Sequence, residues 1–223
     1  MSDLAEALRS AALRWPMHDA RLVRLVAGGR CPPAILQGVA ARVFESAEHF
    51  TGDLALLIDA APNSSLRSHL LENLIEETGQ RVVPGEGLRL DPGNVHLEWA
   101  RSFARACGLD EAALRERISH LPRPAIRGFD DTFAQEGWLG AAAYLLAQEA
   151  NSPRTLAPML RGLESLGFEP AALAFFRNHI EADERHGGGA FVLLAREVDS
   201  DATRDLVLRC TARGALDWWT FHN

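Results

Sequence analysis

The chain has 223 residues, of which 47% are apolar and 24% charged, and its formal net charge at neutral pH is −7. This length and composition predict one globular domain over residues 1–223 with a sizeable core. The acidic balance, with no basic run to offset it, argues against nucleic acid and against an anionic membrane surface as partners.

No apolar stretch approaches the roughly 18 residues that a membrane-spanning helix needs. The first residues, Met1-Ser-Asp-Leu-Ala-Glu6, are acidic and lack the cationic start of a signal peptide. We therefore expect a cytoplasmic protein that does not enter a membrane.

The three cysteines and the basic residues exclude several chemistries. Cys31, Cys107 and Cys210 are widely spaced and form no Cys-x-x-Cys pair, which argues against both a disulfide framework and a thiolate zinc site. All 23 basic residues are arginine. Without lysine, the chain has neither a Schiff-base lysine nor a phosphate-binding loop of the Walker type.

Apolar residues recur at spacings of three and four along nearly the whole chain, and β-branched residues are sparse, so we predict an all-α fold with no strands. Residues 80–92 contain two prolines and two glycines and predict the longest loop. Breaks are also expected at Asn151-Ser-Pro153 and at Gly167. The predicted helices span residues 3–14, 18–27, 33–60, 64–79, 93–107, 110–120, 130–150, 153–166, 169–186 and 200–218.

The run His179-Ile-Glu-Ala-Asp183-Glu-Arg-His186 holds three metal-ligand side chains at positions i, i+4 and i+7. On an α-helix these positions share one face, so the three side chains point the same way. Three glycines, 187–189, follow directly and should weaken or break the helix there.

One helix cannot complete a metal shell, and other helices of a bundle carry further donors. Glu149 ends a strongly apolar helix, where an unpaired carboxylate is costly. Glu76 and Glu77 precede Gly79, and His96 opens a later helix.

Four motifs that contain these donors, in their order along the chain, resemble the haem-oxygenase-like di-iron oxidase family. The resemblance covers about residues 35–195 and implies an antiparallel helical bundle of the haem-oxygenase type in a single domain. Two features depart from the family pattern: the interval from Glu77 to His96 is long, and a different helix phase would put Glu76 in the place of Glu77. The motifs that carry the resemblance are Asn73-Leu-Ile-Glu-Glu77-Thr-Gly79, His96-Leu-Glu-Trp99, Tyr144-x4-Glu149-x3-Pro153 and His179-x3-Asp183-x2-His186.

The resemblance implies two Fe(II) ions per chain, O2 as co-substrate and an external electron donor. Such enzymes desaturate, cleave C–C bonds or oxygenate nitrogen in fatty-acid- or amino-acid-like small molecules. Carboxylate and imidazole donors without thiolate independently suit oxygen-activating iron. The glycines after His186 suggest that the second iron binds labilely. The positions that match the family's metal ligands are Glu77, His96, Glu149, His179, Asp183 and His186.

Other functions stay open at this stage. A ferritin-like di-iron site is disfavoured because the sequence contains no Glu-x-x-His. Haem ligation by His18 or His49 would leave the six donors without a role. A cofactor-free thiaminase-like enzyme would rely on a cysteine such as Cys107 or Cys210, and a non-catalytic interaction protein of the same fold would need no metal. Whether the chain forms a homodimer is also open.

A few further residues attract a prediction. Arg101, Arg105 and Arg177 lie near the motifs and are candidates for binding a substrate carboxylate. Two alternatives stand for Glu45 and Glu48: a role as an additional ligand or proton relay, or exposure on the surface, which we expect. We expect the only tyrosine, Tyr144, to pack or to form a hydrogen bond near the site rather than to carry a radical.

Overall fold

The structure, a computed structural model, describes residues 3–121, 124–187 and 189–223, without the side chains of residues 124–127 and 183–187. Short 3-10 turns precede α2, α5 and α8, at Met17–Asp19, Pro92–Asn94 and Pro170–Leu173. The helices and strands are, in chain order, α1 (Asp3–Ala12), α2 (Arg21–Ala27), α3 (Pro33–Ala60), α4 (Ser65–Glu77), β1 (Gln80–Val83), β2 (Gly87–Leu90), α5 (His96–Ala106), α6 (Glu111–Ser119), α7 (Pro124–Ser165), α8 (Ala174–Gly187), α9 (Ala190–Arg196) and α10 (Asp201–His222).

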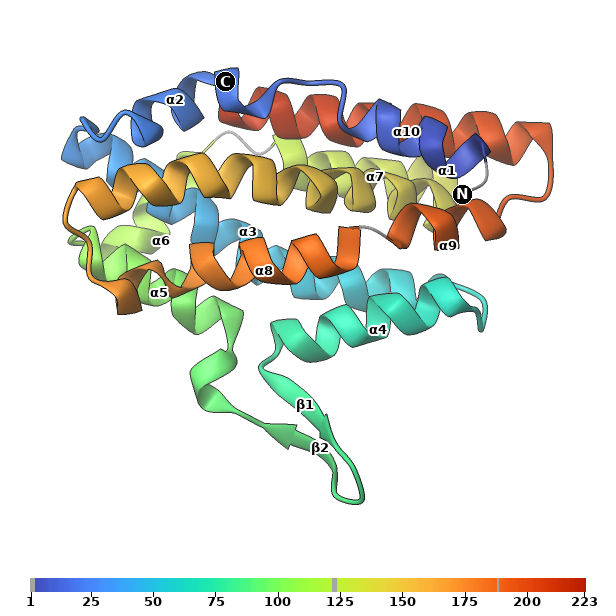
Figure 1. Cartoon of the computed structure of the whole chain (residues 1–223), viewed down its shortest axis with the longest axis horizontal. Coiled ribbons are helices and arrows are strands. Elements are labelled where there is room, and N and C mark those ends of the chain that lie inside the picture. The colour runs from blue at the N-terminus through green and yellow to red at the C-terminus, as the bar shows by residue number, and fades with distance from the viewer. Residues whose placement is uncertain (1–2, 122–123, 188) are drawn as a thin grey trace.

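The long helices lie side by side in one antiparallel bundle, as the sequence predicts (Figure 1). Helix α10 packs along α7, which also contacts α2 and α8, while α3 contacts α4 and α5. The closest approach of α10 to α7 depends on Gly214, because a Cβ at this position would lie 2.3 Å from the Tyr144 carbonyl oxygen. The Tyr144 hydroxyl donates a hydrogen bond of 2.9 Å to Asp217 of α10, so the predicted packing and bonding role of this tyrosine is confirmed.

The predicted break at Asn151-Ser-Pro153 is wrong, because α7 continues through it. Asn151 is buried, and its side-chain amide donates to the carbonyls of Ala12 and Ala147, at 2.8 Å each. These contacts hold the helix where Pro153 removes one backbone hydrogen bond. The backbone of α7 is instead non-helical at Gly137, with φ 71° and ψ −172°.

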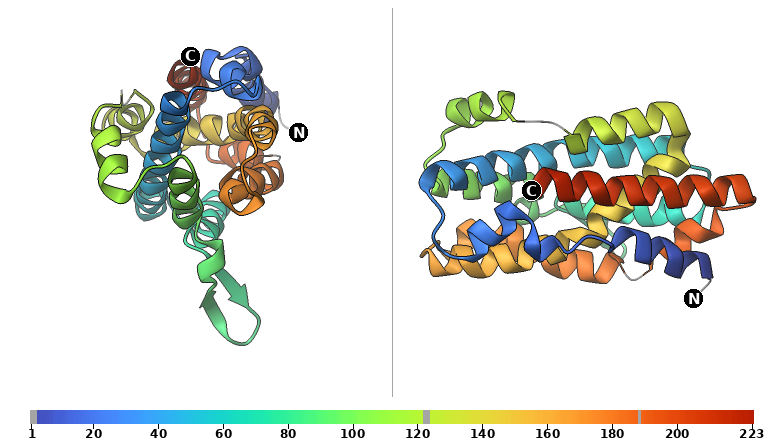
Figure 2. Two further views of the ribbon diagram at one scale, coloured as in Figure 1. Left: turned by 90° about the vertical axis from the view of Figure 1, so that its left-hand side faces the viewer. Right: turned by 90° about the horizontal axis from the view of Figure 1, so that it is seen from above.

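Residues 80–92 contain a β-hairpin, so the predictions of a loop and of no strands are wrong here. Strands β1 and β2 pair antiparallel, with Gln80 opposite Leu90 and Val83 opposite Gly87. The hairpin points away from the bundle, which is clearest in the end-on view (Figure 2). Pro84 and Gly85 lie in its turn, whereas Gly87 begins β2 and Pro92 follows the hairpin. Short strands between such residues carry little periodic signal.

The glycine run after His186 ends a helix, as predicted: α8 ends at Gly187 and a separate short helix, α9, begins at Ala190. None of the predicted helices corresponds to α9. Its Phe191 and Leu194 are buried in the same apolar cluster as residues of α1 and α4.

Two apolar clusters fill the bundle. One joins α1, α4, α9, α10 and the C-terminal part of α3 to the first half of α7. The other joins α2, the N-terminal part of α3, α5, α6 and α8 to its second half. A pocket lies at their border, since Leu145 of the first cluster and Val43 and Met159 of the second all line it.

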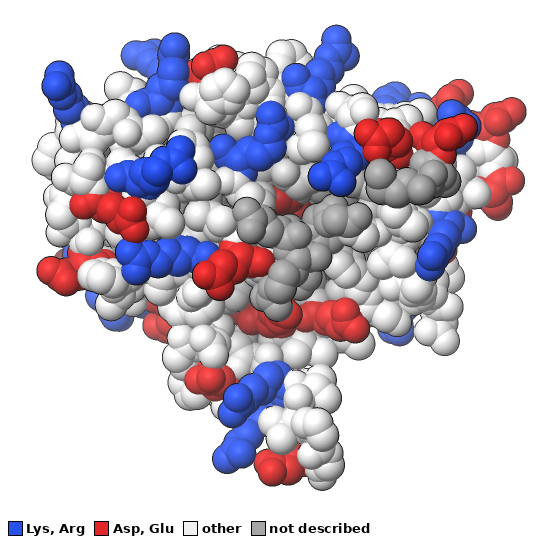
Figure 3. All heavy atoms as spheres, viewed as in Figure 1, with Lys and Arg blue, Asp and Glu red and all other residues white. Residues whose placement is uncertain are grey.

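Arginine and acidic side chains alternate over the face shown in Figure 3, and no continuous basic area appears among the described residues of that face. None of the described helices is both long and apolar enough to cross a bilayer.

Candidate metal centre

The candidate centre is a buried cluster of three side chains from three helices: Glu77 ends α4, His96 begins α5 and His179 lies in α8. Each offers one ligand atom, and these atoms all lie within 4.8 Å of one another. Glu77 is 5% exposed and His96 6% exposed. Among the described residues this is the group of donors arranged to hold a metal ion.

The hairpin brings Glu77 and His96 together although they are distant in sequence. Gly79, with φ 69°, turns the chain out of α4, and the backbone amide of Asp91 donates to its carbonyl oxygen at 2.8 Å. A Cβ on Gly79 would lie 2.8 Å from Val95 Cγ2 and 2.9 Å from the Asp91 oxygen, so only glycine fits. The chain thus leaves and re-enters the bundle at one place, and the hairpin accounts for the long interval.

The orientation of His179 is fixed by Phe175, one turn earlier on α8. His179 Nδ1 lies 3.0 Å from the Phe175 carbonyl oxygen, and the two rings stack with centroids 4.0 Å apart. A hydrogen bond from Nδ1–H to a carbonyl leaves Nε2 unprotonated, which is the usual arrangement of a metal-binding histidine. His179 Nε2 faces Glu77 Oε1 at 3.6 Å.

His96 reaches the same carboxylate from the other side. Its ring stacks on Trp99 at a centroid distance of 4.5 Å and is tilted against the His179 ring at the same distance. His96 Nδ1 lies 2.8 Å from Glu77 Oε2, yet this buried nitrogen makes no hydrogen bond with any described residue. An imidazole nitrogen and a carboxylate oxygen that are close without a hydrogen bond between them fit a shared cation.

The charge of Glu77 fits the same interpretation. Burial alone raises the pKa of this carboxyl, but the contacts with His179 and His96 outweigh burial and hold the pKa at about 2. A carboxylate beside two imidazoles is an oxygen and nitrogen donor set without thiolate, which fits iron or manganese. The residues present therefore fit the implied metal.

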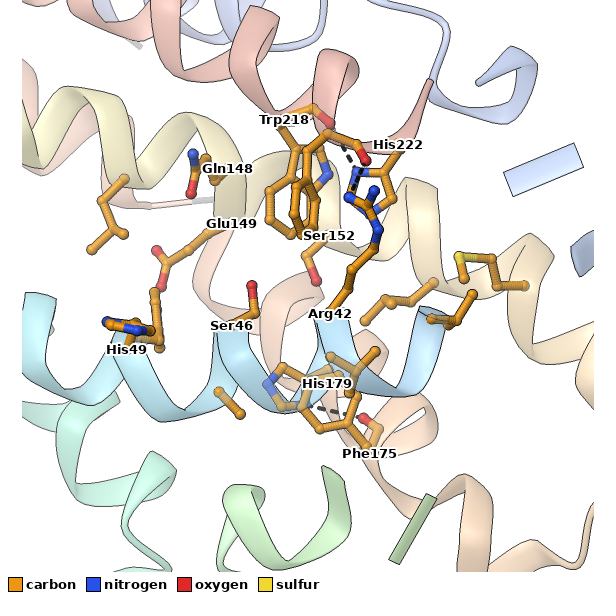
Figure 4. Close-up of a pocket in the computed structure, with 18 of the residues that line it drawn as sticks. Arg42, Ser46, His49, Gln148, Glu149, Ser152, Phe175, His179, Trp218 and His222 are labelled. Atoms are coloured by element: carbon orange, nitrogen blue, oxygen red, sulfur yellow. Dashed lines mark hydrogen bonds between the residues drawn. The ribbon is translucent and has the colours of Figure 1, made fainter. Parts of the chain in front are cut away.

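Glu149 is not part of this cluster but lines the same pocket as Glu77 and His179, on the side where His49 lies (Figure 4). The side-chain amide of Asn73 donates a hydrogen bond to Glu149 Oε1. Asn73 itself is buried on α4, one turn before Glu77. The motif Asn73-x-x-x-Glu77 therefore orients two carboxylates at once, one directly and one through a hydrogen bond.

The remaining predicted donors, Asp183 and His186, have side chains outside the described part of the structure. The backbone of α8 is helical from Ala174 to Gly187, which is the condition for the predicted one-sided spacing with His179. Between the two alternatives at the end of α4, the structure places Glu77 in the cluster, whereas Glu76 is only half-buried.

The pocket runs from this cluster along α3, and sequence reasoning missed its α3 wall (Figure 4). Arg42, Ser46, His49 and Asp53 line it from one face of this helix. The available signal was the recurrence of polar residues at spacings of three and four inside an otherwise apolar helix. Glu45, expected to be exposed, is 1% exposed, so that prediction is wrong.

The arginines that sequence suggested as carboxylate ligands lie elsewhere. Arg177 pairs with Glu164 on the surface, Arg101 pairs with Glu98 and Glu111, and Arg105 is exposed. None of them is among the described residues that line the pocket.

A buried histidine and carboxylate cluster inside an antiparallel helical bundle defines a class of helical metalloproteins, and the comparisons with known proteins name the family. The chain belongs to the iron-containing redox enzyme family, whose sequence profile matches residues 39–219. From sequence, the family resemblance was expected to cover about residues 35–195. The match starts close to that position and extends beyond residue 195 through most of α10. No curated protein sequence matches the chain significantly.

Two solved structures show the fold. A domain of unknown function with a heme oxygenase-like fold from Shewanella denitrificans is 17% identical, with a TM-score of 0.71 over 99% of this chain and 90% of that one. A TenA homolog from Pseudomonas syringae pv. tomato is 11% identical, with a TM-score of 0.72 over 98% of this chain and 88% of that one. The predicted haem-oxygenase-like bundle is confirmed, and at these identities the likeness concerns the fold alone.

Proposed function

We propose that this protein is a non-haem di-iron oxidase that uses O2 to oxidise a small organic molecule bound in the pocket along α3. The observation that carries the proposal is the buried Glu77, His96 and His179 cluster opening into a mainly apolar pocket. Family membership supports iron and redox chemistry. The number of irons, the use of O2 and the oxidation of a fatty-acid- or amino-acid-like substrate are the parts that we propose.

Glu77, His96 and His179 would hold one iron, and Glu149, Asp183 and His186 the second. When bound, two ferrous ions supply the electrons that reduce O2 and so make it able to attack C–H, C–C or C–N bonds, with an external donor restoring the ferrous state.

The protein's own residues prepare this site. Phe175 and Trp99 fix the two imidazole rings, and Asn73 fixes Glu149. Such contacts orient ligands before metal arrives, and their loss typically costs about 10- to 100-fold in metal affinity. The apolar walls of the pocket exclude water from the reacting groups.

A proton-exchanging group also lines the pocket. Burial raises the pKa of Asp53 to about 7, with a further contribution from the charge of Asp130. A carboxyl group with this pKa can hold or release a proton near neutral pH, which O2 reduction requires. We assign this role to the Asp53 carboxyl within the proposal.

The cysteine-dependent alternative finds little support in the site. Burial raises the pKa of Cys210, and burial together with Cys31 raises the pKa of Cys107 to about 12. A thiol with such a pKa is a poor nucleophile. The described lining of the pocket includes no cysteine.

The test is anaerobic titration of metal-free protein with Fe(II), followed by rapid mixing with O2 and a panel of fatty and amino acids. We expect about two irons per chain, as in di-iron carboxylate bundles, and a transient absorbance that one class of substrate accelerates. Absence of iron uptake, or activity that survives chelation, would refute the proposal.

A matched pair of variants locates the metal. Glu77→Gln keeps the shape of the side chain and removes its charge, so iron affinity should fall by about 100-fold. Glu76→Gln removes one charge from the neighbouring residue outside the cluster and should change affinity by less than about 3-fold. Equal effects of both variants would mean that Glu77 is not a ligand.

A further inference from the structure

A continuous series of aromatic rings passes through the metal-ligand cluster. The Trp99 indole stacks on the His96 ring, with centroids 4.5 Å apart and planes 23° from parallel. The His96 ring lies 4.5 Å from the His179 ring, which stacks on Phe175 at 4.0 Å. Two of these rings belong to α5 and two to α8. Each ring touches the next, so the series links both imidazoles to an indole.

Trp99 is the member of this series that connects it to the surface. His96 is 6% exposed, whereas Trp99 is half-buried. The indole N–H donates to the carbonyl oxygen of exposed Gly93 at 2.8 Å, in the turn where the chain returns from the hairpin to α5 (Figure 1). Trp99 does not line the pocket. A molecule in solution can therefore reach the indole without entering the pocket.

Trp99 also has the right chemistry to lose an electron. Among natural side chains, indole, phenol and thiol are oxidised by one electron most readily, whereas the phenyl ring of Phe175 is not. The only tyrosine, Tyr144, is bonded to Asp217 and lies outside the described lining of the pocket. Trp218 lines the pocket from α10, but its described ring contacts are with residues of α10 itself. Trp99 is thus the oxidisable ring in contact with the cluster among the described residues.

We propose that Trp99 is an electron-transfer residue, which returns electrons from the surface to an oxidised metal site when no substrate fills the pocket. The inference rests on the proposed function, because the oxidant is the metal site after its reaction with O2. This site takes one electron from the indole, which becomes a radical cation. A small one-electron reductant at the surface, such as ascorbate, then gives one electron to the indole. The net transfer is one electron from the reductant to the site, and Trp99 is unchanged.

The hydrogen bond of the indole favours movement of the electron without the proton. Its partner, the Gly93 carbonyl oxygen, accepts a hydrogen bond but is too weak a base to take the proton. The indole therefore keeps its N–H while it is oxidised, and it needs no reprotonation when the electron returns.

The benefit of this route is protection of the pocket. An oxidised site without substrate would otherwise attack the side chains that surround it. Met159 lines the pocket, and a thioether is readily converted to the sulfoxide, which is polar and disrupts apolar packing. Removal of the indole should therefore move the damage from Trp99 to the pocket, with Met159 the most sensitive residue.

The first experiment looks for the radical. Metal-free protein is loaded anaerobically with Fe(II), mixed with O2 without substrate, and frozen at successive times for electron paramagnetic resonance. The wild type should give a radical signal that narrows when its tryptophans carry deuterated rings, and Trp99→Phe should lose this signal. Trp138→Phe, which changes another half-buried tryptophan on α7, is the matched control and should keep it. A signal that persists in Trp99→Phe, or that responds to deuterated tyrosine instead, would overturn the proposal.

The second experiment needs no variant. All five tryptophans of the chain are half-buried, so exposure alone predicts that they oxidise alike. After repeated exposure of the iron-loaded wild type to O2 without substrate, peptide mass spectrometry should find oxidation concentrated at Trp99, and ascorbate should suppress it. In Trp99→Phe, sulfoxide should appear at Met159. Equal oxidation of the five tryptophans would overturn the proposal.

Iron content and O2 consumption of the same samples separate this inference from the proposed function. If iron binds and O2 is consumed without a tryptophan radical or selective oxidation of Trp99, the electron-transfer role fails and the di-iron function stands. If neither iron nor O2 is taken up, the oxidant is missing and both fail. Trp99→Phe keeps an aromatic ring against His96, so its iron content and circular dichroism should match the wild type. Should this variant lose iron or fold poorly, the oxidation pattern of the wild type decides alone.

Discussion

On one side of the pocket, Glu77, His96 and His179 each offer a ligand atom, and these atoms lie within 4.8 Å of one another. Near the end of α10, Arg42 donates a hydrogen bond to the Phe221 carbonyl oxygen and lies over the Phe221 ring. The first arrangement suits a small cation and the second suits an anionic group. Under the proposed function, the metal and the substrate would occupy different sides of this one pocket.

The largest expected effect is on the metal side of the pocket. His179→Ala removes the nitrogen that faces Glu77, so Fe(II) affinity should fall by at least about 100-fold while the protein stays folded. Iron content after anaerobic loading, with circular dichroism of the same samples, checks this. His120→Ala, a surface histidine at the end of α6, is the control and should retain full iron. Full iron in His179→Ala would show that the cluster is not the binding site.

The next effect tests how the hairpin positions His96. Gly79→Ala combines positive φ with overlap against Val95 and Asp91, and should lower the free energy of unfolding by about 2–4 kcal/mol. Gly85→Ala, at the hairpin tip, has positive φ but open space and should cost only about 1 kcal/mol.

Urea unfolding measures the loss of stability in both variants. Titration with Fe(II) shows whether a displaced backbone at residue 79 also disturbs the metal cluster. We expect Gly79→Ala to weaken iron binding and Gly85→Ala to leave it unchanged. Equal iron affinity in the two variants would mean that the base of the hairpin does not position His96.

The third effect concerns His222, near the end of α10, and depends on pH. Burial, with the charge of Arg42, lowers the pKa of His222 from 6.5 to about 4, although its bond to the Trp218 carbonyl opposes this shift. The unfolded chain then binds more protons than the folded one between these values, so stability is complete above about pH 6.5 and falls as pH decreases toward 4.

The loss should approach about 3 kcal/mol at the low end of that window. Urea unfolding of wild type and His222→Gln at several pH values checks it, and the variant should lack this part of the pH dependence. Identical slopes in the two proteins would assign the acid sensitivity to other groups.

Most helices could be predicted from sequence because their signals are local. Apolar spacing located α3 and α10, the glycines after His186 ended α8, and the three-residue cluster used donors that the motifs had suggested. The continuity of α7 through Pro153 and the hairpin could not be predicted in the same way. Buried contacts of Asn151 override the local effect of Pro153, and the hairpin depends on pairing between strands too short to show periodicity.

Sequence alone determined the all-α class, the donor types and their order along the chain, since helix periodicity and ligand chemistry are properties of the residues themselves. Only the tertiary structure decided that Glu77 rather than Glu76 joins the cluster, and that Arg42 rather than Arg101, Arg105 or Arg177 lines the pocket. Both choices depend on the rotation of one helix against its neighbours. Packing across the bundle fixes that rotation, and no local pattern records it.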